Sequence, residues 1–342
     1  MANNSSLHAA KDAKNDEFYT RYEDIQAELN HYEDHFKGKT VLCNCDDPFE
    51  SNFCKFFLRN FNYLKLKRLI CTSYAESPVV GEQMTIYDMS DEPVERGHGY
   101  VMDITSVPMA NGRGVSDDDI ERLLKSKKRG VQKLWGDGDF RSDECIEYLN
   151  QADIVVTNPP FSLFREYVGQ LIAFDKEFLI IGNKNSIKYK EIFPLLKDNK
   201  IWLGVTAPKE FMRPDGKTKK FGYIGWFTNL DVSKRHEMLI MFKHYNPEDY
   251  PVYDELKNVI MVDTVANTPC DWDGYMAVPF MKFFEEFNPD QFEVLDILNR
   301  YTVMDYFGVN EDVRKRHSHC CNVNGKATFT RVVIRKKSKK EN

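Results

Sequence analysis

The chain has 342 residues, of which 42% are hydrophobic and 29% are charged, and its formal net charge is -6. This composition allows a substantial buried core and excludes a disordered polymer. No stretch of the sequence approaches the roughly 18 apolar residues that a membrane span needs, and the N-terminal segment lacks the apolar core of a secretory signal. We therefore expect a cytoplasmic protein with one large domain and a smaller appended region.

Eight cysteines are spread over the chain, several of them within apolar runs, and we interpret them as reduced thiols. A cluster formed by His317, His319, Cys320 and Cys321 could be imagined as a metal site. It lacks a second pair of ligands at a zinc-finger spacing, so we expect no metal.

A net charge of -6 does not by itself exclude a nucleic-acid partner, because affinity for phosphate depends on local clusters of positive charge. Basic runs occur at residues 122–133, 209–220, 314–316 and 331–340. Each run taken alone is typical of an ordinary solvated surface, whereas together they allow a segregated positive face. Both interpretations stay open.

Short apolar runs and longer amphipathic stretches alternate along the chain, which is typical of an α/β fold. In chain order, strands are expected at residues 40–45, 68–73, 153–157 and 178–182, and helices at residues 51–60, 142–150 and 162–174. The expected strands are dense in apolar residues, as parallel strands covered on both faces should be. We predict a doubly wound, mostly parallel sheet.

Two segments interrupt this alternation. Residues 76–134 are rich in Gly, Pro and charged side chains, and we interpret them as an insertion between the second and third strands. A polar loop at 207–220 precedes the aromatic run FGYIGWFTNLD, which we expect to form an antiparallel hairpin that closes the sheet. The sequence thus predicts an N-terminal segment at 1–38, a main domain at 39–230 and a smaller region at 231–342.

The strongest motif is Asn158-Pro159-Pro160-Phe161, which directly follows the strand-like stretch DIVVT. Two successive prolines remove two backbone donors, so the turn presents carbonyl acceptors at the carboxyl end of a strand, where open α/β sheets bind ligands. The Asn158 side-chain oxygen and the Pro159 carbonyl suit the two hydrogens of a purine's exocyclic amine, and Phe161 can stack on an extruded base. The alternative is a plain proline-terminated strand with Asn158 as a cap.

Acidic residues follow the other expected strands. Asp46 lies where the first strand turns into a helix, at the position of a Gly-rich cofactor loop, although no glycine occurs there. Its carboxylate would suit a cofactor's amino group or ribose, and Glu76, the first acid after the second strand, would suit ribose hydroxyls. In the stretch GDGDF, Asp139 and Phe140 could contact an adenine amine and ring, the alternative being a glycine turn before a helix.

The chain resembles the EcoRI modification methylase family of adenine-N6 DNA methyltransferases over most of its length. The matching stretches are NDEFYTRYEDI, VLCNCDDPFESNFCKFF, GDGDFRS, DIVVTNPPFSLFREY, FLIIGNKNSI, KIWLGV, GWFTNLD and AVPFMKFFEEFNPDQFEVLD. Their order is similar to the gamma arrangement of amino-methyltransferases, in which a cofactor lid, a cofactor loop, the catalytic turn and a recognition region follow one another. The matching stretches leave out residues 76–134 and 206–220, so the DNA sequence recognised stays open.

The resemblance implies a catalytic domain of the S-adenosylmethionine-dependent methyltransferase type, with double-stranded DNA as partner. It leaves room for a cognate restriction endonuclease that acts on the same site without direct contact. The implied parts are a cofactor lid at 1–38, a catalytic domain at 39–230 and a target-recognition region at 231–342. The expected catalytic residues are Asn158, Pro159, Pro160 and Phe161. The expected cofactor contacts are Phe18, Tyr19, Thr20, Asn44, Asp46, Pro48, Ser51, Glu76, Asp139 and Phe140.

The polar loop at 207–220 is the basic run that we expect to reach DNA, because it precedes the aromatic segment that should border the base pocket. The candidate DNA contacts are Lys209, Arg213, Lys217, Lys219, Lys220 and Trp226.

Two other functions stay open. An NPP-aromatic turn also serves enzymes that methylate RNA adenine or a protein glutamine amide, and a catalytically silent nucleic-acid-binding protein could retain the same fold. The matches beyond residue 225 favour DNA over the first alternative, and the intact Asn158–Phe161 motif favours activity over the second.

Overall fold

The computed structural model describes residues 19–47, 51–74, 98–109, 115–124, 131–212, 218–220, 222–256, 258–298 and 321–337. The chain divides into two compact units. Unit 1 comprises Met1–Gly182 and Thr206–Leu230, and unit 2 comprises Asn183–Val205 and Asp231–Asn342. Asn183–Val205, which belong to unit 2, lie within the predicted main domain. The cysteines that the structure describes are free thiols.

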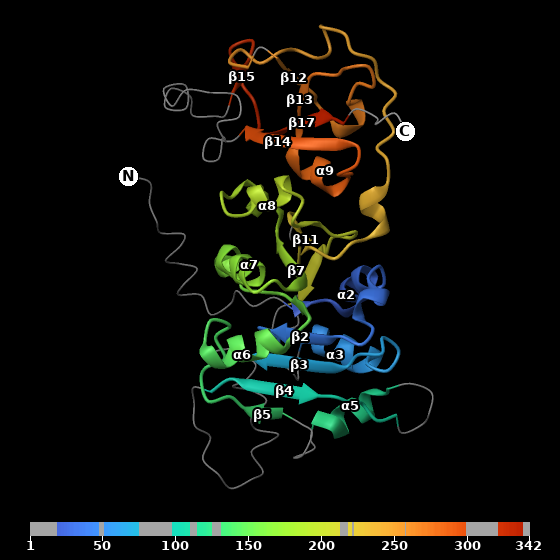
Figure 1. Ribbon diagram of the computed structural model, residues 1–342, viewed down its shortest axis with the longest axis vertical. Coiled ribbons are helices and arrows are strands. Elements are labelled where there is room, and N and C mark those ends of the chain that lie inside the picture. Colours follow the sequence, from blue (N-terminus) through green and yellow to red (C-terminus); the bar gives the residue numbers. More distant parts are fainter. Residues whose placement is uncertain are drawn as a thin grey trace. The chain divides into compact units, whose positions relative to one another are not determined.

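Unit 1 is built on a mixed sheet (Figure 1). Its strands are β2 (Thr40–Asn44), β3 (Arg68–Ser73), β4 (Tyr100–Ile104), β5 (Val131–Lys133), β6 (Ile154–Thr157), β7 (Glu177–Asn183) and β11 (Ile224–Thr228). They lie in the order β5-β4-β3-β2-β6-β7-β11. The pairs β2/β3, β2/β6 and β6/β7 are parallel. All residues of β2 and β6 are buried, as expected for strands covered on both faces.

In the part of unit 1 that the structure describes, the helices are α2 (Tyr22–Leu29), α3 (Asn52–Asn60), α5 (Asp117–Leu124), α6 (Asp143–Gln151) and α7 (Phe164–Ala173), with short 3-10 turns η1 (Glu33–Phe36) and η2 (Phe161–Leu163). Serine caps start two of them: Ser51 Oγ accepts a hydrogen bond from the Phe53 amide, and Ser142 Oγ accepts one from the Cys145 amide. The sequence therefore fixes the start of α3 and α6 locally.

The prediction of an α/β fold is confirmed, but the sheet is mixed. Residues within the predicted insertion at 76–134 form β4 and β5. β4 pairs with β3 in antiparallel fashion, and β5 pairs with β4 in the same way. The aromatic run that was predicted to form a closing hairpin gives one strand among the described residues, β11, which joins the main sheet. β9 (Glu210–Met212) and β10 (Thr218–Lys220), which lie in the predicted polar loop, pair with β1 (Tyr19–Thr20) in a separate three-stranded sheet. These strands have two to five residues each, which is too short for a periodic signal that would predict the pairings.

Unit 2 contains a four-stranded sheet in the order β12-β13-β17-β14. These strands are Val259–Met261, Tyr275–Pro279, Arg331–Lys336 and Phe292–Leu298, respectively. The other elements are η3 (Lys184–Lys188), α8 (Phe193–Lys197), β8 (Trp202–Leu203), η4 (Ser233–His236), η5 (Val265–Asn267), α9 (Phe280–Glu285), β15 (Asn322–Val323) and β16 (Lys326–Ala327). Its core includes Tyr253, Val259, Ala277, Leu295 and Val333.

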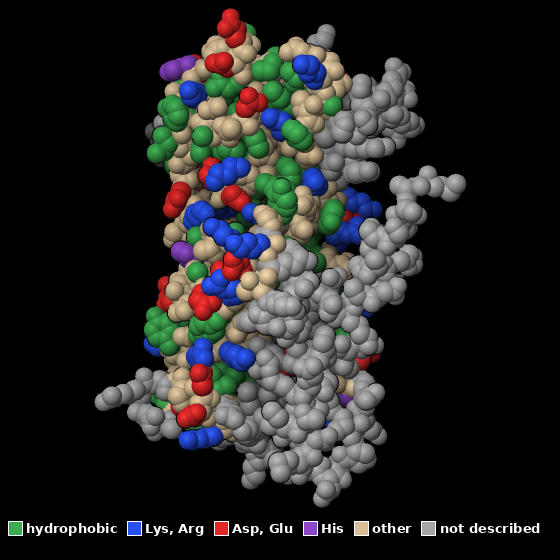
Figure 2. Space-filling view, turned by 180° about the vertical axis from the view of Figure 1, so that it is seen from behind, with side chains coloured by type: hydrophobic (Ala, Val, Ile, Leu, Met, Phe, Trp, Pro, Cys, Tyr) green, Lys and Arg blue, Asp and Glu red, His purple; other side chains and the backbone are tan. Residues whose placement is uncertain are grey.

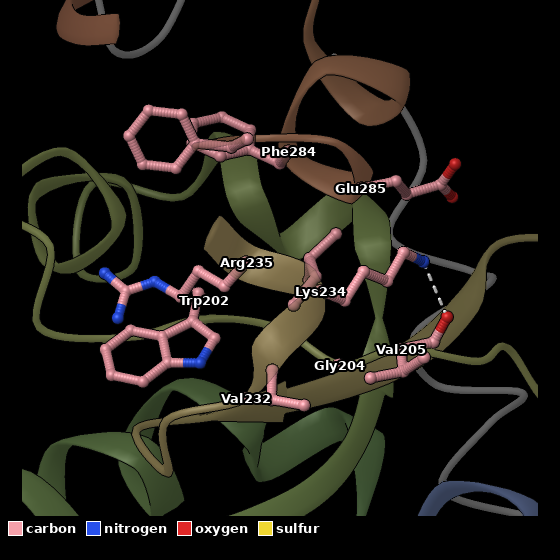
Figure 3. Close-up of a pocket in the computed structure, with 10 residues that line it drawn as sticks. Trp202, Gly204, Val205, Val232, Lys234, Arg235, Phe284 and Glu285 are labelled. Atoms are coloured by element: carbon pink, nitrogen blue, oxygen red, sulfur yellow. Dashed lines mark hydrogen bonds between the residues drawn. The ribbon is translucent and has the colours of Figure 1, made fainter. Parts of the chain in front are cut away.

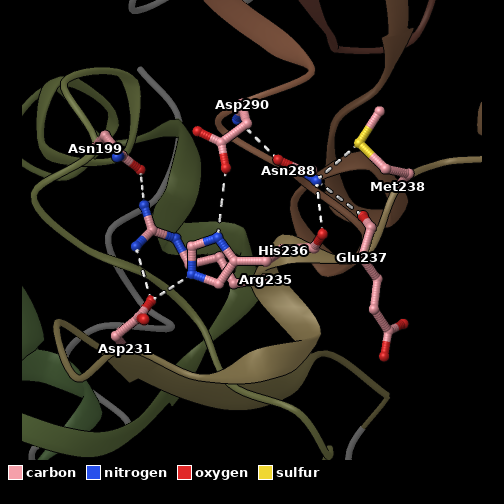
Figure 4. A network of polar contacts seen from close by, with 8 residues as sticks. All are labelled: Asn199, Asp231, Arg235, His236, Glu237, Met238, Asn288 and Asp290. Atoms are coloured by element: carbon pink, nitrogen blue, oxygen red, sulfur yellow. Dashed lines mark hydrogen bonds and ion pairs between the residues drawn. The ribbon is translucent and has the colours of Figure 1, made fainter.

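The segment that enters unit 2 at residue 231 is held by a polar network (Figure 4). The His236 ring bonds to Asp231 at 2.8 Å and to Asp290 at 3.5 Å, and these carboxylates, Asp231 foremost, raise the pKa of His236. The Arg235 guanidinium stacks 3.5 Å from the centre of the Trp202 ring. Asn288 donates to the His236 and Glu237 carbonyls. These contacts fix the backbone of η4.

Candidate active site

The predicted site residues gather where β2, β3 and β6 end. Because these strands are parallel, their carboxyl ends lie at one edge of the sheet, where α/β proteins bind ligands. β2 ends at Asn44 and is followed by residues 45–47, and Asn158–Phe161 follow β6. The GDGDF stretch lies against the end of β3. Gly138 approaches Ser73 so closely that a Cβ on it would lie 2.0 Å from the Ser73 carbonyl oxygen, and its φ is +80°. Glycine is required at this close approach.

Asp46 joins the loop after β2 to the catalytic turn. Its carboxyl group accepts a hydrogen bond from Ser51 Oγ at 2.7 Å and bonds to Thr157 Oγ1 through its other oxygen. The backbone amide of Asn158 also donates to it. The Asp46 amide in turn donates to the Thr72 carbonyl at 3.0 Å. Asp46 therefore connects the ends of β2, β3 and β6 through hydrogen bonds that lie inside the protein.

The protonation of Asp46 follows from its surroundings. Burial raises the pKa of this carboxyl group well above the ordinary 3.8, against the smaller lowering by its hydrogen bonds from Thr157, Ser51 and the Asn158 amide. Thr157 Oγ1 contacts both Asp46 and the Asn44 carbonyl. A hydroxyl has one hydrogen and a carbonyl can only accept, so when Thr157 donates to Asn44 the Asp46 carboxyl must donate to Thr157. Burial therefore shifts Asp46 toward its protonated form.

The turn after β6 combines buried and exposed residues. Pro159 is buried, Asn158 is half-buried, and Phe161 has 36% of its surface exposed. The Pro160 carbonyl accepts a hydrogen bond from the Leu163 amide at 3.0 Å, which closes η2. The Phe161 ring is therefore available at the surface of the site.

The helix after the turn is fixed by close packing. The Phe164 ring lies 5.0 Å from the Phe227 ring and so near Gly182 that a Cβ there would lie 2.4 Å from it. Tyr167, one helical turn further on, donates to Asn44 Oδ1 and packs edge-on against Phe140. The turn between β6 and α7 is thus anchored at both of its ends.

Two predicted cofactor contacts are engaged with neighbouring side chains in this structure. The Asp139 carboxylate forms two bonds to the Arg141 guanidinium, at 2.6 and 2.9 Å, and Arg141 lowers the pKa of Asp139. Phe140 is buried against Tyr167 rather than open to a ligand. A contact from Asp139 to an adenine amine would require Arg141 to move away.

The predicted lid packs against the start of α3. The Thr20 carbonyl accepts a hydrogen bond from Asn52 Nδ2 at 2.7 Å, and the Thr20 hydroxyl is buried without a hydrogen-bond partner among the residues that the structure describes. Tyr19 and Thr20 form β1, which pairs with Met212 and Phe211 of β9. Three further predicted contacts, Phe18, Pro48 and Glu76, lie outside the described residues.

The predicted DNA loop is the partner of this lid. Lys209 and Lys220 are exposed, and Lys220 bonds to Glu210 at 3.3 Å while Arg21, next to β1, bonds to the same carboxylate at 3.2 Å. The backbone of Lys219 pairs with Phe211. Arg213 and Lys217 lie outside the described residues. On the face that Figure 2 displays, Lys and Arg side chains alternate with Asp and Glu.

Trp226 lies in the core. Its side chain has no exposed surface, and its ring packs edge-on against Phe53 at 5.9 Å. As the structure stands, Trp226 supports the sheet and presents no surface to DNA. The aromatic run around it gave no sign of which ring faces inward, because every residue of β11 is buried.

Sequence reasoning missed the residues that connect these loops. Thr157 is the single polar residue at the end of an apolar strand, and that position was a usable signal. Glu28, Asn52 and Tyr167 lie on helices with ordinary amphipathic patterns and gave none. Their role appears only in the hydrogen bonds that they make.

Comparisons with known proteins decide the family. The family model described as adenine-specific methyltransferase EcoRI matches residues 6–337. The chain belongs to this family. It is 41% identical to the Type II methyltransferase M.EcoRI of Escherichia coli, with 98% of each chain covered. It is 36% identical to M.MpnI of Mycoplasma pneumoniae, covering 97% of this chain and 98% of the relative. No solved structure matches.

As a member of the EcoRI methylase family, the chain is an adenine-specific DNA methyltransferase. The methyl donor of methyltransferases in general is S-adenosylmethionine. Among the described residues, no helix is both long and apolar enough to cross a membrane.

A small pocket in unit 2 of this methyltransferase is lined by Trp202, Gly204, Val205, Lys234 and Phe284 (Figure 3). Lys234 Nζ donates to the Val205 carbonyl at 2.8 Å, and Arg235 covers the Trp202 ring. Its polar groups are used in contacts within unit 2, and we assign it a structural role.

Proposed function

We propose that this enzyme methylates N6 of an adenine that is rotated out of double-stranded DNA, and that Asn158–Phe161 is its catalytic turn. The observation that carries the proposal is the position of this turn, which ends β6 at the ligand-binding edge of the sheet and is bonded to Asp46 through the Asn158 amide. The backbone of the NPPF motif is thus held by a hydrogen bond to a buried carboxyl group, which supports its predicted role.

The turn suits an amine that is a weak nucleophile. The N6 lone pair is delocalised into the purine until acceptors draw its hydrogens out of the ring plane. In this proposal, Asn158 Oδ1 and the Pro159 carbonyl each accept one N6 hydrogen, and Phe161 stacks on the base. The new nitrogen–carbon bond would form as the bond between the methyl carbon and the donor's sulfur breaks, and one N6 hydrogen would leave as a proton to solvent. Rotating the base out costs a few kcal/mol, which stacking on an exposed ring offsets in part.

The residues present fit S-adenosylmethionine as donor. The Thr20 hydroxyl is buried and bonds to no other described residue, which leaves one polar group that a bound ligand would satisfy. When bound, the cofactor supplies an electrophilic methyl group. Thr20, with Phe18 and Tyr19, would hold its methionine end, and Asp139 would hold its adenosine end once Arg141 moves away from it.

Asp46 has a different part in this proposal from the one predicted. Both of its oxygens are used inside the protein, so we assign it to positioning Asn158 rather than to binding the cofactor. The names of the family and of its Type II relatives favour DNA over the RNA and protein alternatives, and protection of DNA from a cognate restriction endonuclease is the role that we propose.

The test is methylation of plasmid DNA by the purified protein with S-adenosylmethionine, followed by long-read mapping of modified bases. We expect N6-methyladenine within one short sequence and no modified cytosine. Methylation of RNA alone, or cofactor binding without any methylated DNA, would refute the proposal.

A further inference from the structure

Unit 2 brings a histidine, a cysteine and an aspartate together on two chain segments. A parallel bridge pairs Lys243 with Pro269, and the Cys270 amide donates to the Lys243 carbonyl at 2.8 Å. The next residues, His244 on one segment and Cys270 and Asp271 on the other, therefore face each other. His244 Nδ1, Cys270 Sγ and one Asp271 oxygen all lie within 4.8 Å of one another.

Two of the three distances between these atoms are close to those of neighbouring metal ligands. His244 Nδ1 lies 3.1 Å from Asp271 Oδ2 and 3.8 Å from Cys270 Sγ. Tetrahedral zinc, with bonds of about 2.0–2.3 Å, separates such ligand atoms by about 3.4–3.6 Å. Adjustments of a few tenths of an ångström would bring both pairs to that separation.

The backbone around the cluster is fixed by contacts that leave the ligand atoms facing one another. Asp271 Oδ1 accepts a hydrogen bond from the Tyr245 amide at 2.8 Å, which lowers the pKa of Asp271 and turns the other oxygen toward His244. Lys336 Nζ donates a hydrogen bond to the Cys270 carbonyl at 2.6 Å. The Tyr245 and Trp272 rings pack at 4.3 Å beside the cluster.

We propose that His244, Cys270 and Asp271 bind a zinc-class divalent ion through three protein atoms, with the remaining coordination position open to solvent. A thiolate and an imidazole favour zinc over magnesium or calcium, which prefer oxygen ligands. The neighbouring charges are Lys243 and Lys336, which oppose cation binding, and Asp273, which bonds to Lys336 at 3.4 Å and offsets part of that charge.

The simpler alternative is an ion pair between His244 and Asp271 with Cys270 as a bystander. It accounts for the 3.1 Å contact but assigns no role to the thiol. Sequence spacing did not reveal the cluster because Cys270 and Asp271 lie 26 and 27 residues from His244, and the cluster near His317, where we expected no metal, involves different residues.

The ion would join the segment at 243–245 to the segment at 269–271. Since it binds the folded state only, it would raise stability with rising ion concentration. The proposal is independent of methyl transfer, because none of the three residues belongs to the site at the end of β6.

The test uses the full chain, freed of metal with a chelator and titrated with Co²⁺ as a spectroscopic probe for zinc. We expect stoichiometric binding, a thiolate-to-cobalt absorption band, and an increase in Tm on adding Zn²⁺. Cys270→Ser should abolish the band, and His244→Gln should weaken binding by more than about tenfold. His31→Gln, which changes an exposed histidine elsewhere, should leave both signals intact.

Each other outcome counts against the proposal. If the wild type shows no absorption band, the metal site is refuted and the cluster is an ion pair between His244 and Asp271. A band that persists in both Cys270→Ser and His244→Gln would place the metal at other residues, such as the cluster at 317–321. Wild-type methylation by Cys270→Ser is expected in every case, so failure of the metal proposal stays separate from failure of the proposed function.

Discussion

At the scale of single residues, the buried carboxyl group of Asp46 decides how the catalytic turn is held. It is bonded to Ser51, Thr157 and the Asn158 amide, and its environment favours the neutral form. A neutral carboxyl can donate one hydrogen bond and accept others, as an asparagine side chain can. An asparagine should therefore replace it, whereas an alanine should not.

We predict that Asp46→Asn retains methyl transfer within a few-fold of wild type, and that Asp46→Ala lowers kcat by on the order of 10²-fold, because Asn158 loses its support and small displacements cost about that much. Steady-state kinetics and the Kd for S-adenosylmethionine check this. If Asp46 bound the cofactor as an anion, Asp46→Asn would instead weaken cofactor affinity, and its methyl-transfer rate would be as low as that of Asp46→Ala.

The raised pKa of Asp46 also predicts a pH dependence of stability. The folded state binds the proton more tightly than the unfolded state, so the contribution is complete below the ordinary pKa of 3.8 and is lost as pH rises through the raised folded pKa. Wild type should therefore lose stability relative to Asp46→Asn as pH increases above about 4. Urea unfolding of both proteins measures the difference in the free energy of unfolding. If wild type instead became more stable relative to the variant as pH rises, Asp46 would be an ionised carboxylate that the fold stabilises.

At the scale of elements, the three-stranded sheet links the predicted cofactor lid to the predicted DNA loop. β9 pairs with β1 on one side and β10 on the other, and Arg21 and Lys220 share the Glu210 carboxylate. α2 reaches the base of the same loop, since the buried Glu28 accepts hydrogen bonds from the Thr206 amide and hydroxyl, both at 2.6 Å.

Glu28→Ala should lower the free energy of unfolding by about 1–3 kcal/mol, because it leaves the partly buried donors of Thr206 without their acceptor. The variant should also weaken DNA binding through displacement of the loop. Glu23→Ala is the matched control, since Glu23 lies on the same helix with 71% of its side chain exposed, and it should stay within about 0.5 kcal/mol of wild type. Equal effects of the two substitutions would remove Glu28 from this role.

At the scale of the whole molecule, the sequence predicted the parallel centre of the sheet and the place of the NPPF turn, because apolar strands and a proline pair act locally. It did not predict that β4 and β5 extend the sheet in antiparallel fashion, or that β9 and β10 pair with β1. Those pairings depend on contacts between distant segments, as does the Asp46 network that supports Asn158. The burial of Trp226, which packs against Phe53 in α3, was not predicted for the same reason.

Affinity for DNA should depend on positive charge in the loop that carries β9 and β10, because a chain with net charge -6 binds a polyanion only through local basic clusters. We expect the triple variant Lys209→Gln, Lys219→Gln, Lys220→Gln to reduce the salt slope of log K by up to about 0.9 for each phosphate that these lysines neutralise, with unchanged cofactor affinity. The control replaces the exposed Lys37, Lys65 and Lys67, which removes the same charge elsewhere in unit 1. Identical slopes for both triple variants would exclude the loop.

The central claim is that Asn158 activates the adenine amine, and Asn158→Ala tests it most directly. Methyl transfer to plasmid DNA and the Kd for S-adenosylmethionine are measured on the same preparation of each protein. The account predicts a loss of on the order of 10²–10³ in kcat with cofactor affinity nearly unchanged, because the acceptor acts mainly in the transition state. A variant that methylates adenine at close to the wild-type rate would contradict it.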